Sequence, residues 1–128
     1  FNIVPTDQTV DVYDATAFEG RTHVTPAERD ELAGLLATGM RDTVRDHWPT
    51  QEAYTYWDYR AGMFHKDLGF RIDLIVAGDP IAERVQAAWV DRQARKGTKP
   101  SDHAPVIVDL DVAPDGNIGP MVPPHVAD

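Results

Sequence analysis

The sequence predicts a mixed α/β (α+β) domain in which short apolar strands alternate with helices. A capped helix signal lies in the N-terminal part, and apolar runs typical of buried strands lie at residues 72–77 and 106–110. The 128 residues are enough for one hydrophobic core and too few for two domains of ordinary size. The chain has no cysteine, which excludes disulfides and leaves the cytoplasm as the simplest location.

The first half of the chain contains one strong helix signal. Residues 1–4 have the apolar character of a strand end, whereas residues 7–24 show no period and indicate a loop. Thr25–Glu28 is a capping box with proline at the first helical position, and leucines follow at helical spacing. The pattern therefore predicts a helix over residues 26–38, with a further helical turn within residues 41–48.

The second half reads as short strands joined by polar segments. The predicted elements are strands at 54–57, 72–77, 85–93 and 106–110 and a helical turn at 80–84. Residues 94–105 are polar and rich in Lys, Gly and Pro, which predicts a loop. From residue 111 to 128 the chain is Pro-rich and has no periodicity. We therefore expect one domain over residues 1–110 and a mobile tail over residues 111–128.

Charge is distributed unevenly along the chain. The net charge of −9 argues against an indiscriminate nucleic-acid binder. Residues 60–103 nevertheless carry eight basic and six acidic side chains, whereas the segments on either side are net acidic. A polyanionic substrate would therefore be received by this block, unless the clustering is a chance one. No apolar run approaches the roughly 18 residues of a membrane span, so no membrane partner is expected.

One loop carries the chemistry that stands out most. Residues Pro100–Val106 (PSDHAPV) place Asp102 and His103 between prolines that restrict the backbone, and Asp73 lies 27 residues before Pro100. A histidine that a carboxylate orients can polarise a phosphate or move a proton. An Asp-His pair in a solvated turn is the alternative interpretation.

Four motifs in this order resemble one enzyme family. They are Phe1–Asp7 (FNIVPTD), Tyr56–Arg60 (YWDYR), Gly69–Asp73 (GFRID) and Pro100–Val106. Together they resemble the C-terminal half of the exonuclease III family of abasic-site (AP) endonucleases, within the endonuclease/exonuclease/phosphatase superfamily. The resemblance covers residues 1 to about 110. It implies half of a two-sheet β-sandwich flanked by helices, with the site on loops along one edge of the sheets.

The resemblance also implies an activity. The family performs Mg²⁺-dependent hydrolysis of duplex DNA 5′ to abasic sites and has 3′ to 5′ exonuclease activity, and Mn²⁺ is an alternative ion. The implied partners are duplex DNA with abasic sites or 3′ ends, and the N-terminal half of the fold. The family carries its water-activating aspartate and its metal-binding glutamate before the segment that matches here. We therefore expect the chain to be inactive alone.

The resemblance assigns four residues to catalysis: Asn2, Asp73, Asp102 and His103. Asn2 would hold a phosphoryl oxygen or the attacking water, and His103, oriented by Asp73, would donate to a phosphate oxygen. Asp102 is the expected Mg²⁺ ligand, and Asn2 and His103 are also candidates to approach a metal. The alternatives are a turn-capping asparagine at residue 2 and a surface histidine at residue 103.

Four further residues are candidates for substrate binding. Tyr56, Phe70 and Ile72 match the apolar pocket that in the family accepts a flipped abasic sugar, and ordinary core residues are the alternative. Arg71 would meet a phosphate beside that pocket or form a surface ion pair. Trp57 is expected in the core. The other four histidines show no ligand spacing, which makes a zinc site improbable.

Two other functions are compatible with these motifs. One is a superfamily phosphodiesterase that acts on lipid or inositol phosphates, which the aromatic Tyr56–Trp57 segment and Phe70 disfavour. The other is a non-catalytic domain that keeps the fold and binds DNA or a partner. Residues upstream of Phe1 would separate that reading from an enzyme.

Overall fold

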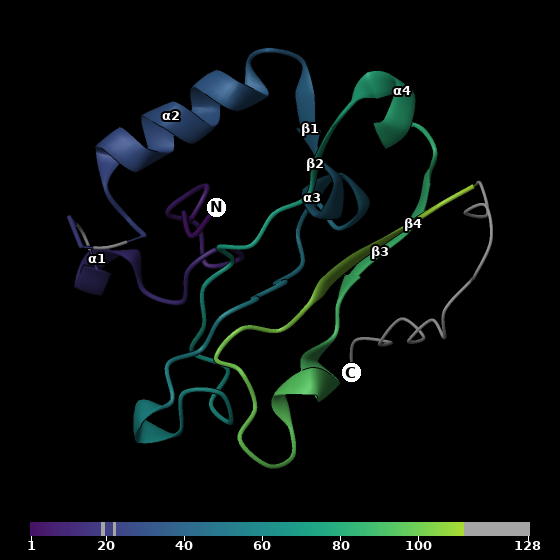
Figure 1. Cartoon of the computed structure of the whole chain (residues 1–128). Helices are drawn as coiled ribbons and strands as arrows, with labels where there is room; N and C mark the ends of the chain where they lie inside the picture. The colour runs from purple at the N-terminus through teal and green to yellow at the C-terminus, as the bar shows by residue number, and fades with distance from the viewer. Residues whose placement is uncertain (19, 22, 112–128) are drawn as a thin grey trace.

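The computed structural model describes residues 1–18, 20, 21 and 23–111, which form short helices and two small antiparallel sheets (Figure 1). This composition confirms the predicted mixed α/β class. The predicted tail lies outside the described residues from residue 112 onward. No helix in the described ranges is both long and apolar enough to pass through a bilayer.

Helix α2 (Pro26–Leu36) confirms the strongest local prediction. The Thr25 hydroxyl accepts a hydrogen bond from the Glu28 amide at 3.2 Å and donates to the Glu28 carboxylate at 2.6 Å. This exchange satisfies an amide that the first turn would otherwise leave unpaired. The helix ends two residues before the predicted position, and Leu32 is its buried residue.

The first sheet joins β1 (Met40–Asp42) to β2 (Val76–Gly78) in antiparallel register. Its edge β1 leads directly into α3 (Thr43–His47), whose first turn is capped by the Asp42 carboxylate at 3.2 Å from the Arg45 amide. The short helix predicted within residues 41–48 is confirmed, whereas β1 was not predicted. Three residues are too few to show the alternation that marks a strand.

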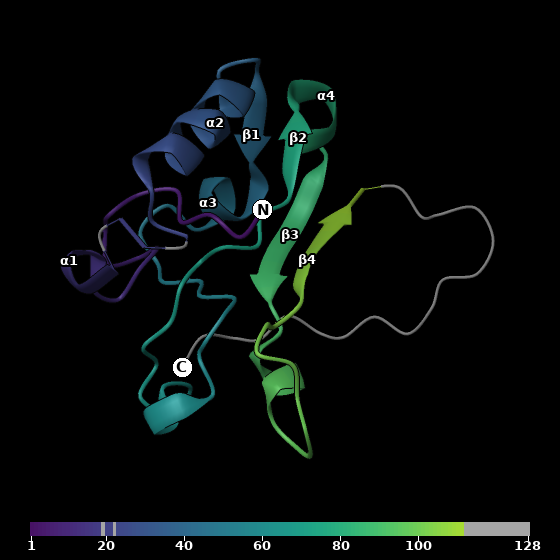
Figure 2. The ribbon, with the colours of Figure 1, turned by 60° about the vertical axis from the view of Figure 1, so that its left-hand side comes forward.

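The second sheet joins β3 (Val85–Val90) to β4 (Val106–Leu110), with a bulge between Val85 and Ala87. Figure 2 shows the two strands side by side, reached from β2 through α4 (Asp79–Ala82). Both predicted strands and the helical turn are confirmed. The end of the predicted 85–93 strand instead leads into the short 3₁₀ helix η2 (Arg92–Arg95), which also occupies the start of the predicted loop.

The strands predicted at residues 1–4 and 54–57 are wrong. Of the strand predicted at residues 72–77, only the last two residues belong to β2, and residues 72–75 are not in a strand. Residues 1–4 have no strand pairing, although Val4 is fully buried. At residues 54–57 only isolated bridges form, from Tyr56 to Phe70 and His103. The amides of Thr55 and Tyr56 both donate to the Phe70 carbonyl, at 2.9 and 3.1 Å. Two donors on one acceptor are the pattern of a β-bulge, which interrupts a regular ladder.

Two clusters of buried hydrophobic residues meet at Tyr13. The first cluster contains Val4, Val12, Val24, Phe70 and Ile72. The second contains Tyr54, Trp57 and Ala104. Tyr13 packs against both clusters, and α1 (Ala15–Phe18) adds Phe18 to the first. The expectation of loop throughout residues 7–24 is therefore wrong at α1.

Candidate active site

Asp73 is fixed by a buried threonine. The Thr55 hydroxyl accepts hydrogen bonds from the Ile72 and Asp73 amides, both at 3.1 Å. The bulge places Thr55 beside these two amides, and its side chain is 1% exposed. The backbone that carries the Asp73 carboxylate is therefore held from a neighbouring segment.

The predicted pairing of Asp73 with His103 is present. The Asp73 carboxylate accepts a hydrogen bond from His103 Nδ1 at 2.7 Å. Both side chains are about one third exposed, at 31% for Asp73 and 36% for His103. A carboxylate that accepts from Nδ1 leaves Nε2 as the ring nitrogen that can act on a substrate.

Asp102 lies on the other side of the same ring. Its carboxylate is 3.9 Å from His103 Nε2 and is 39% exposed. The Tyr56 ring contacts the imidazole edge-on at 5.3 Å between centroids. Burial, with the nearby carboxylates of Asp58 and Asp102, raises the pKa of the Tyr56 phenol above its ordinary value. The imidazole thus has Asp73 at Nδ1, Asp102 near Nε2 and the Tyr56 ring at its edge, and its side chain is 36% exposed.

Asn2 is brought to this edge by the backbone. The backbone amide of Asn2 donates to the carbonyl of Ile72, the residue before Asp73, at 2.8 Å. The backbone carbonyl of Asn2 lies 2.6 Å from His23 Nδ1. Its φ of 57° lies in the left-handed region that asparagine tolerates better than most residues. The backbone of Asn2 is therefore joined to the segment that carries Asp73, and Asp73 is joined to the loop that carries Asp102 and His103.

The three predicted pocket residues do not share one environment. Phe70 is 6% exposed and Ile72 is 0% exposed, and both belong to the first core cluster. Full burial gives Ile72 no surface for a sugar, so the core alternative describes it better in this structure. Of the three, Tyr56 links the core to the site, because its ring stacks on Phe70 and contacts His103.

Arg71 does not join the site. Its guanidinium is 2% exposed, with Nε 2.6 Å from Asp11 and Nη2 2.7 Å from Asp42. Both expectations, a phosphate contact and a surface ion pair, are contradicted by this position. Two carboxylates already occupy the guanidinium, and the surrounding side chains exclude a ligand.

The sequence interpretation missed the buried charges around Arg71. Asp11 accepts from Arg71, from Arg45 at 2.7 Å and from the Thr6 hydroxyl at 2.6 Å. Burial raises the pKa of Asp11, but Arg71 and these hydrogen bonds outweigh it, so the net shift is downward. An available signal was the acidic residue between Val10 and Val12, because a carboxylate in an apolar run requires a partner.

The described residues supply only part of a metal site. No group of three or more acidic, histidine or cysteine side chains comes together within the described residues. Asp102 fits a hard cation because Mg²⁺ needs only one or two carboxylates and keeps several waters. His103 fits less well, since Nδ1 is already bound to Asp73. Further metal ligands would have to come from beyond these residues.

Comparison with known sequences connects this arrangement to DNA nucleases. No protein-family model matches the chain. It is 32% identical over 110 residues to exodeoxyribonuclease III from Haemophilus influenzae, across 82% of this chain and 41% of the relative. It is 30% identical over 100 residues to an exodeoxyribonuclease from Bacillus subtilis, across 77% and 38%. The chain thus spans about two fifths of the length of these relatives.

Solved structures agree with the sequence comparison. A 3′ phosphatase from Neisseria, bound to a product DNA hairpin, superimposes with a TM-score of 0.82 and 38% identity over 88% of this chain and 43% of that chain. An AP endonuclease from Archaeoglobus fulgidus gives 0.81 and 32% identity over 87% and 43%. The fold is therefore part of the endonuclease/exonuclease/phosphatase fold, a class of phosphodiester and phosphate hydrolases that is generally metal-dependent.

Within that class the relationship is specific. The two sequence relatives are exodeoxyribonucleases, and the two structural neighbours are a 3′ phosphatase and an AP endonuclease. The chain is thus homologous to part of the exonuclease III family of AP endonucleases, which confirms the resemblance seen in the four motifs.

Proposed function

We propose that this chain is the phosphate-binding part of a Mg²⁺-dependent DNA repair nuclease. The intact protein would hydrolyse the phosphodiester 5′ to an abasic site and remove nucleotides from 3′ ends. The observation that carries the proposal is the hydrogen bond from His103 Nδ1 to Asp73, which leaves Nε2 outside that contact and 3.9 Å from the Asp102 carboxylate. An oriented imidazole can stabilise the charge that develops on a phosphoryl oxygen.

Each remaining site residue has a role in this proposal. Asp102 would bind the cation, Mg²⁺ or Mn²⁺, and Asn2 would hold the water or a phosphoryl oxygen. Tyr56 would form one wall of the substrate site, because its ring lies between the core and His103. The cation would supply charge neutralisation at the phosphate.

Duplex DNA is the proposed partner because basic side chains are exposed near the Asp102-His103 loop. Lys96 and Lys99 lie in the chain just before that loop, and Arg60, on η1 (Arg60–Gly62), is 86% exposed although it pairs with Asp58 at 2.8 Å. Such side chains contribute sequence-independent phosphate contacts. The cytoplasm remains the proposed location, since a chain without cysteine gives no support to an oxidising compartment.

The second proposed partner is the remainder of the related fold. Within the described residues β4 pairs only with β3, and its valines and isoleucine are half-buried on an open edge. An apolar strand with a free edge is normally covered in a stable protein. The water-activating aspartate and the metal-binding glutamate would come with that remainder, so the isolated chain should not cleave DNA.

The test uses the full-length protein with Mg²⁺ and a duplex that contains one abasic site. Incision immediately 5′ to the site is expected, and the isolated chain serves as the inactive control. Hydrolysis of inositol phosphates without DNA cleavage would favour the other superfamily phosphodiesterases instead. DNA binding with no hydrolysis of either substrate would favour a non-catalytic domain.

A second candidate activity is removal of 3′ phosphates. The Neisseria relative of known structure, 38% identical to this chain, is a 3′ phosphatase. Duplexes that end in a 3′ phosphate, a 3′ hydroxyl or an internal abasic site would separate the candidates. A rate that is highest on the 3′ phosphate, with little incision at the abasic site, would make this the principal activity.

A further inference from the structure

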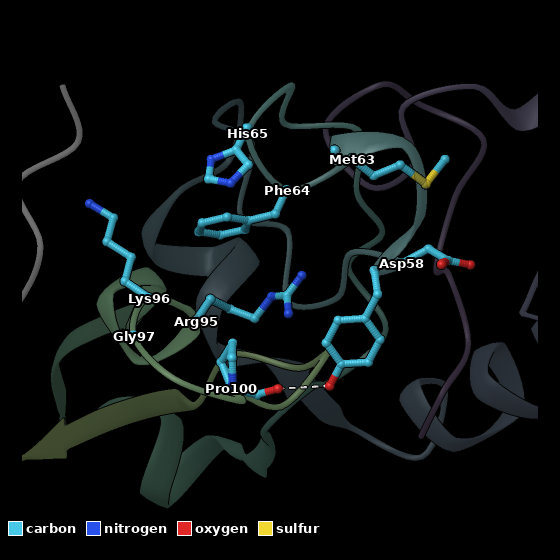
Figure 3. Close-up of a pocket in the computed structure, with 10 residues that line it drawn as sticks. Asp58, Met63, Phe64, His65, Arg95, Lys96, Gly97 and Pro100 are labelled. Atoms are coloured by element: carbon cyan, nitrogen blue, oxygen red, sulfur yellow. Dashed lines mark hydrogen bonds between the residues drawn. The ribbon is translucent and has the colours of Figure 1, made fainter.

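One buried arginine outside the site is hydrogen-bonded to the Asp102-His103 loop and to the segment that carries Tyr56. Arg95, in η2, is 5% exposed, and its side chain borders a pocket of about 320 Å³ between residues 58–65 and 95–100 (Figure 3). Three aromatic rings surround its guanidinium: Phe64 at 4.9 Å, Tyr59 at 5.3 Å and Trp57 at 5.8 Å. This enclosure restricts the guanidinium to one position.

The guanidinium donates to two backbone carbonyls. Nη1 is 2.7 Å from the Ser101 carbonyl and Nη2 is 3.1 Å from the Trp57 carbonyl. Ser101 directly precedes Asp102, and Trp57 directly follows Tyr56. A single planar group thus ties the segment that carries Tyr56 to the loop that carries Asp102 and His103.

Neighbouring groups complete the anchoring of the loop. The Tyr59 hydroxyl donates to the Pro100 carbonyl at 2.7 Å, and the Trp57 amide donates to the Asp102 carbonyl at 3.1 Å. With Arg95 on Ser101, three consecutive loop carbonyls each accept a hydrogen bond. Figure 3 shows the Pro100 contact beside the Arg95 side chain. The loop is therefore ordered before any substrate arrives.

We propose that Arg95 is a positioning residue for Asp102 and His103, assisted by Tyr59. The inference rests on the proposed function, since it concerns the same site. Arg95 acts through the Ser101 carbonyl and touches neither substrate nor metal. Displacement of a reacting group by about 1 Å can lower a rate about 100-fold, so a backbone anchor next to Asp102 affects turnover more than binding.

Arg92 provides a matched control. Its guanidinium lies over two of the same rings, 5.3 Å from Trp57 and 5.0 Å from Phe64, and pairs with Asp67 at 3.5 Å. Within the described residues it makes no hydrogen bond to the loop carbonyls. Arg92→Met therefore removes a comparable cation–π contact without removing the anchor.

The experiment compares the full-length protein with its Arg95→Met, Arg95→Lys and Arg92→Met variants. We expect Arg95→Met to lower kcat on abasic duplex about 10- to 100-fold while KM changes less than about twofold. Arg92→Met should change kcat less than about twofold. Arg95→Lys should recover part of the loss, because an ammonium can reach one carbonyl but not hold both.

A structural readout separates this inference from the proposed function. The His103 Nδ1 proton, assigned with a His103→Gln variant, should shift or broaden in the NMR spectrum of Arg95→Met and stay unchanged in Arg92→Met. This signal reports the Asp73 contact even if the protein cleaves no DNA. Tyr59→Phe should shift the His103 Nδ1 signal in the same direction, by a smaller amount. Because Tyr59 is 62% exposed, this variant should fold, and it tests the anchor if Arg95→Met does not fold.

Two results would overturn the inference. The first is an unchanged His103 signal and unchanged kcat in both folded variants, Arg95→Met and Tyr59→Phe. The second is an equal loss of kcat in Arg95→Met and Arg92→Met, which would mean that the cation–π contacts, and not the loop hydrogen bonds, matter.

Discussion

Two charged groups lie two residues apart on one segment, and they have opposite relations to solvent. Arg71 is enclosed, with its guanidinium between Asp11 and Asp42. Asp73 is 31% exposed and pairs with His103, which is 36% exposed and has its second ring nitrogen 3.9 Å from Asp102. Both arrangements use a carboxylate and a cationic or protonatable side chain, so residue type alone does not distinguish them.

The surroundings of Arg71 and Asp73 differ in how many polar atoms still lack a hydrogen-bond partner. Around Arg71, both oxygens of Asp11 and both outer nitrogens of the guanidinium have partners. Around Asp73, the His103 Nε2 and the Asp102 carboxylate retain capacity for a ligand. Buried charges must be fully paired to be tolerated, whereas a site must keep part of its capacity open. The first group should therefore control stability and the second activity.

The largest expected effect follows removal of the buried cation. Arg71→Met leaves Asp11 and Asp42 without their main partner, and breaking a buried pair in this way costs about 3–5 kcal/mol. Chemical unfolding of the full-length protein should show a lower midpoint with an unchanged slope. Arg41→Met, at an exposed pair with Asp46, is the control and should leave the midpoint unchanged. An Arg71→Met midpoint equal to that of Arg41→Met would mean that the buried pairs of Arg71 do not control the stability of the protein.

The next largest effect is on activity. His103→Asn should lower kcat on abasic duplex about 100- to 1,000-fold, the range for loss of one donor to a developing negative charge. Asp73→Asn should lower it less, because the ring remains but loses its orienting carboxylate. Both side chains are about one third exposed, so the melting temperature should change little. Steady-state kinetics and thermal unfolding of the same samples check this, and a large loss of stability with retained kcat would contradict it.

An intermediate effect is expected at Thr55, which touches both regions. Thr55→Val removes the acceptor for the Ile72 and Asp73 amides, and a buried unsatisfied donor costs about 1–3 kcal/mol. Because the Asp73 backbone loosens, kcat should fall as well. Thr55→Ser retains the hydroxyl and should recover both quantities in unfolding and kinetic assays. Loss of stability with no change in kcat would show that Asp73 is positioned without Thr55.

The smallest effect is a dependence of stability on acid. The pKa of Asp11 in the folded protein lies below its ordinary value of 3.8. Its contribution is therefore complete above that value and is lost as the pH falls toward the folded pKa, because the unfolded chain binds the proton first. One group changes the free energy of unfolding by at most about 1.4 kcal/mol per pH unit.

Urea midpoints of the full-length protein and its Asp11→Asn variant between pH 6 and pH 3 measure this effect. The variant should be less stable at pH 6, and the difference should narrow below about pH 4. A difference that widens toward acid would mean that the folded pKa is raised rather than lowered.

The sequence predicted those features that depend on neighbouring residues or on a complete motif. The Thr25–Glu28 capping box determines where α2 starts, because donor and acceptor are three residues apart. The pairing of Asp73 with His103 followed from the four ordered motifs, and the structure contains it.

Features that depend on distant partners were missed. Arg71 was expected at a phosphate or in a surface ion pair, whereas it is buried against Asp11, 60 residues earlier. The apolar neighbours of Asp11 indicate that it needs a partner, but no local pattern shows that Arg71 is that partner. The strand expected at residues 54–57 has strand-forming residues, but the Thr55–Tyr56 bulge depends on the position of Phe70 across the pairing. Propensity describes a strand's surroundings on average and cannot locate such an interruption.

The anchored loop has a consequence for sequence variation. The Arg95 side chain is hydrogen-bonded to the Ser101 carbonyl, so the residues between them form a short loop with fixed ends. Residues 96–99 of this loop are exposed. Its turn uses left-handed conformations at Gly97, with φ of 105°, and at Lys99, with φ of 50°. Lengthening an exposed tip between fixed ends costs little loop-closure entropy. Insertions between residues 96 and 99 should thus be accommodated without moving His103, which makes this tip a position where related enzymes could acquire new reach toward their substrates.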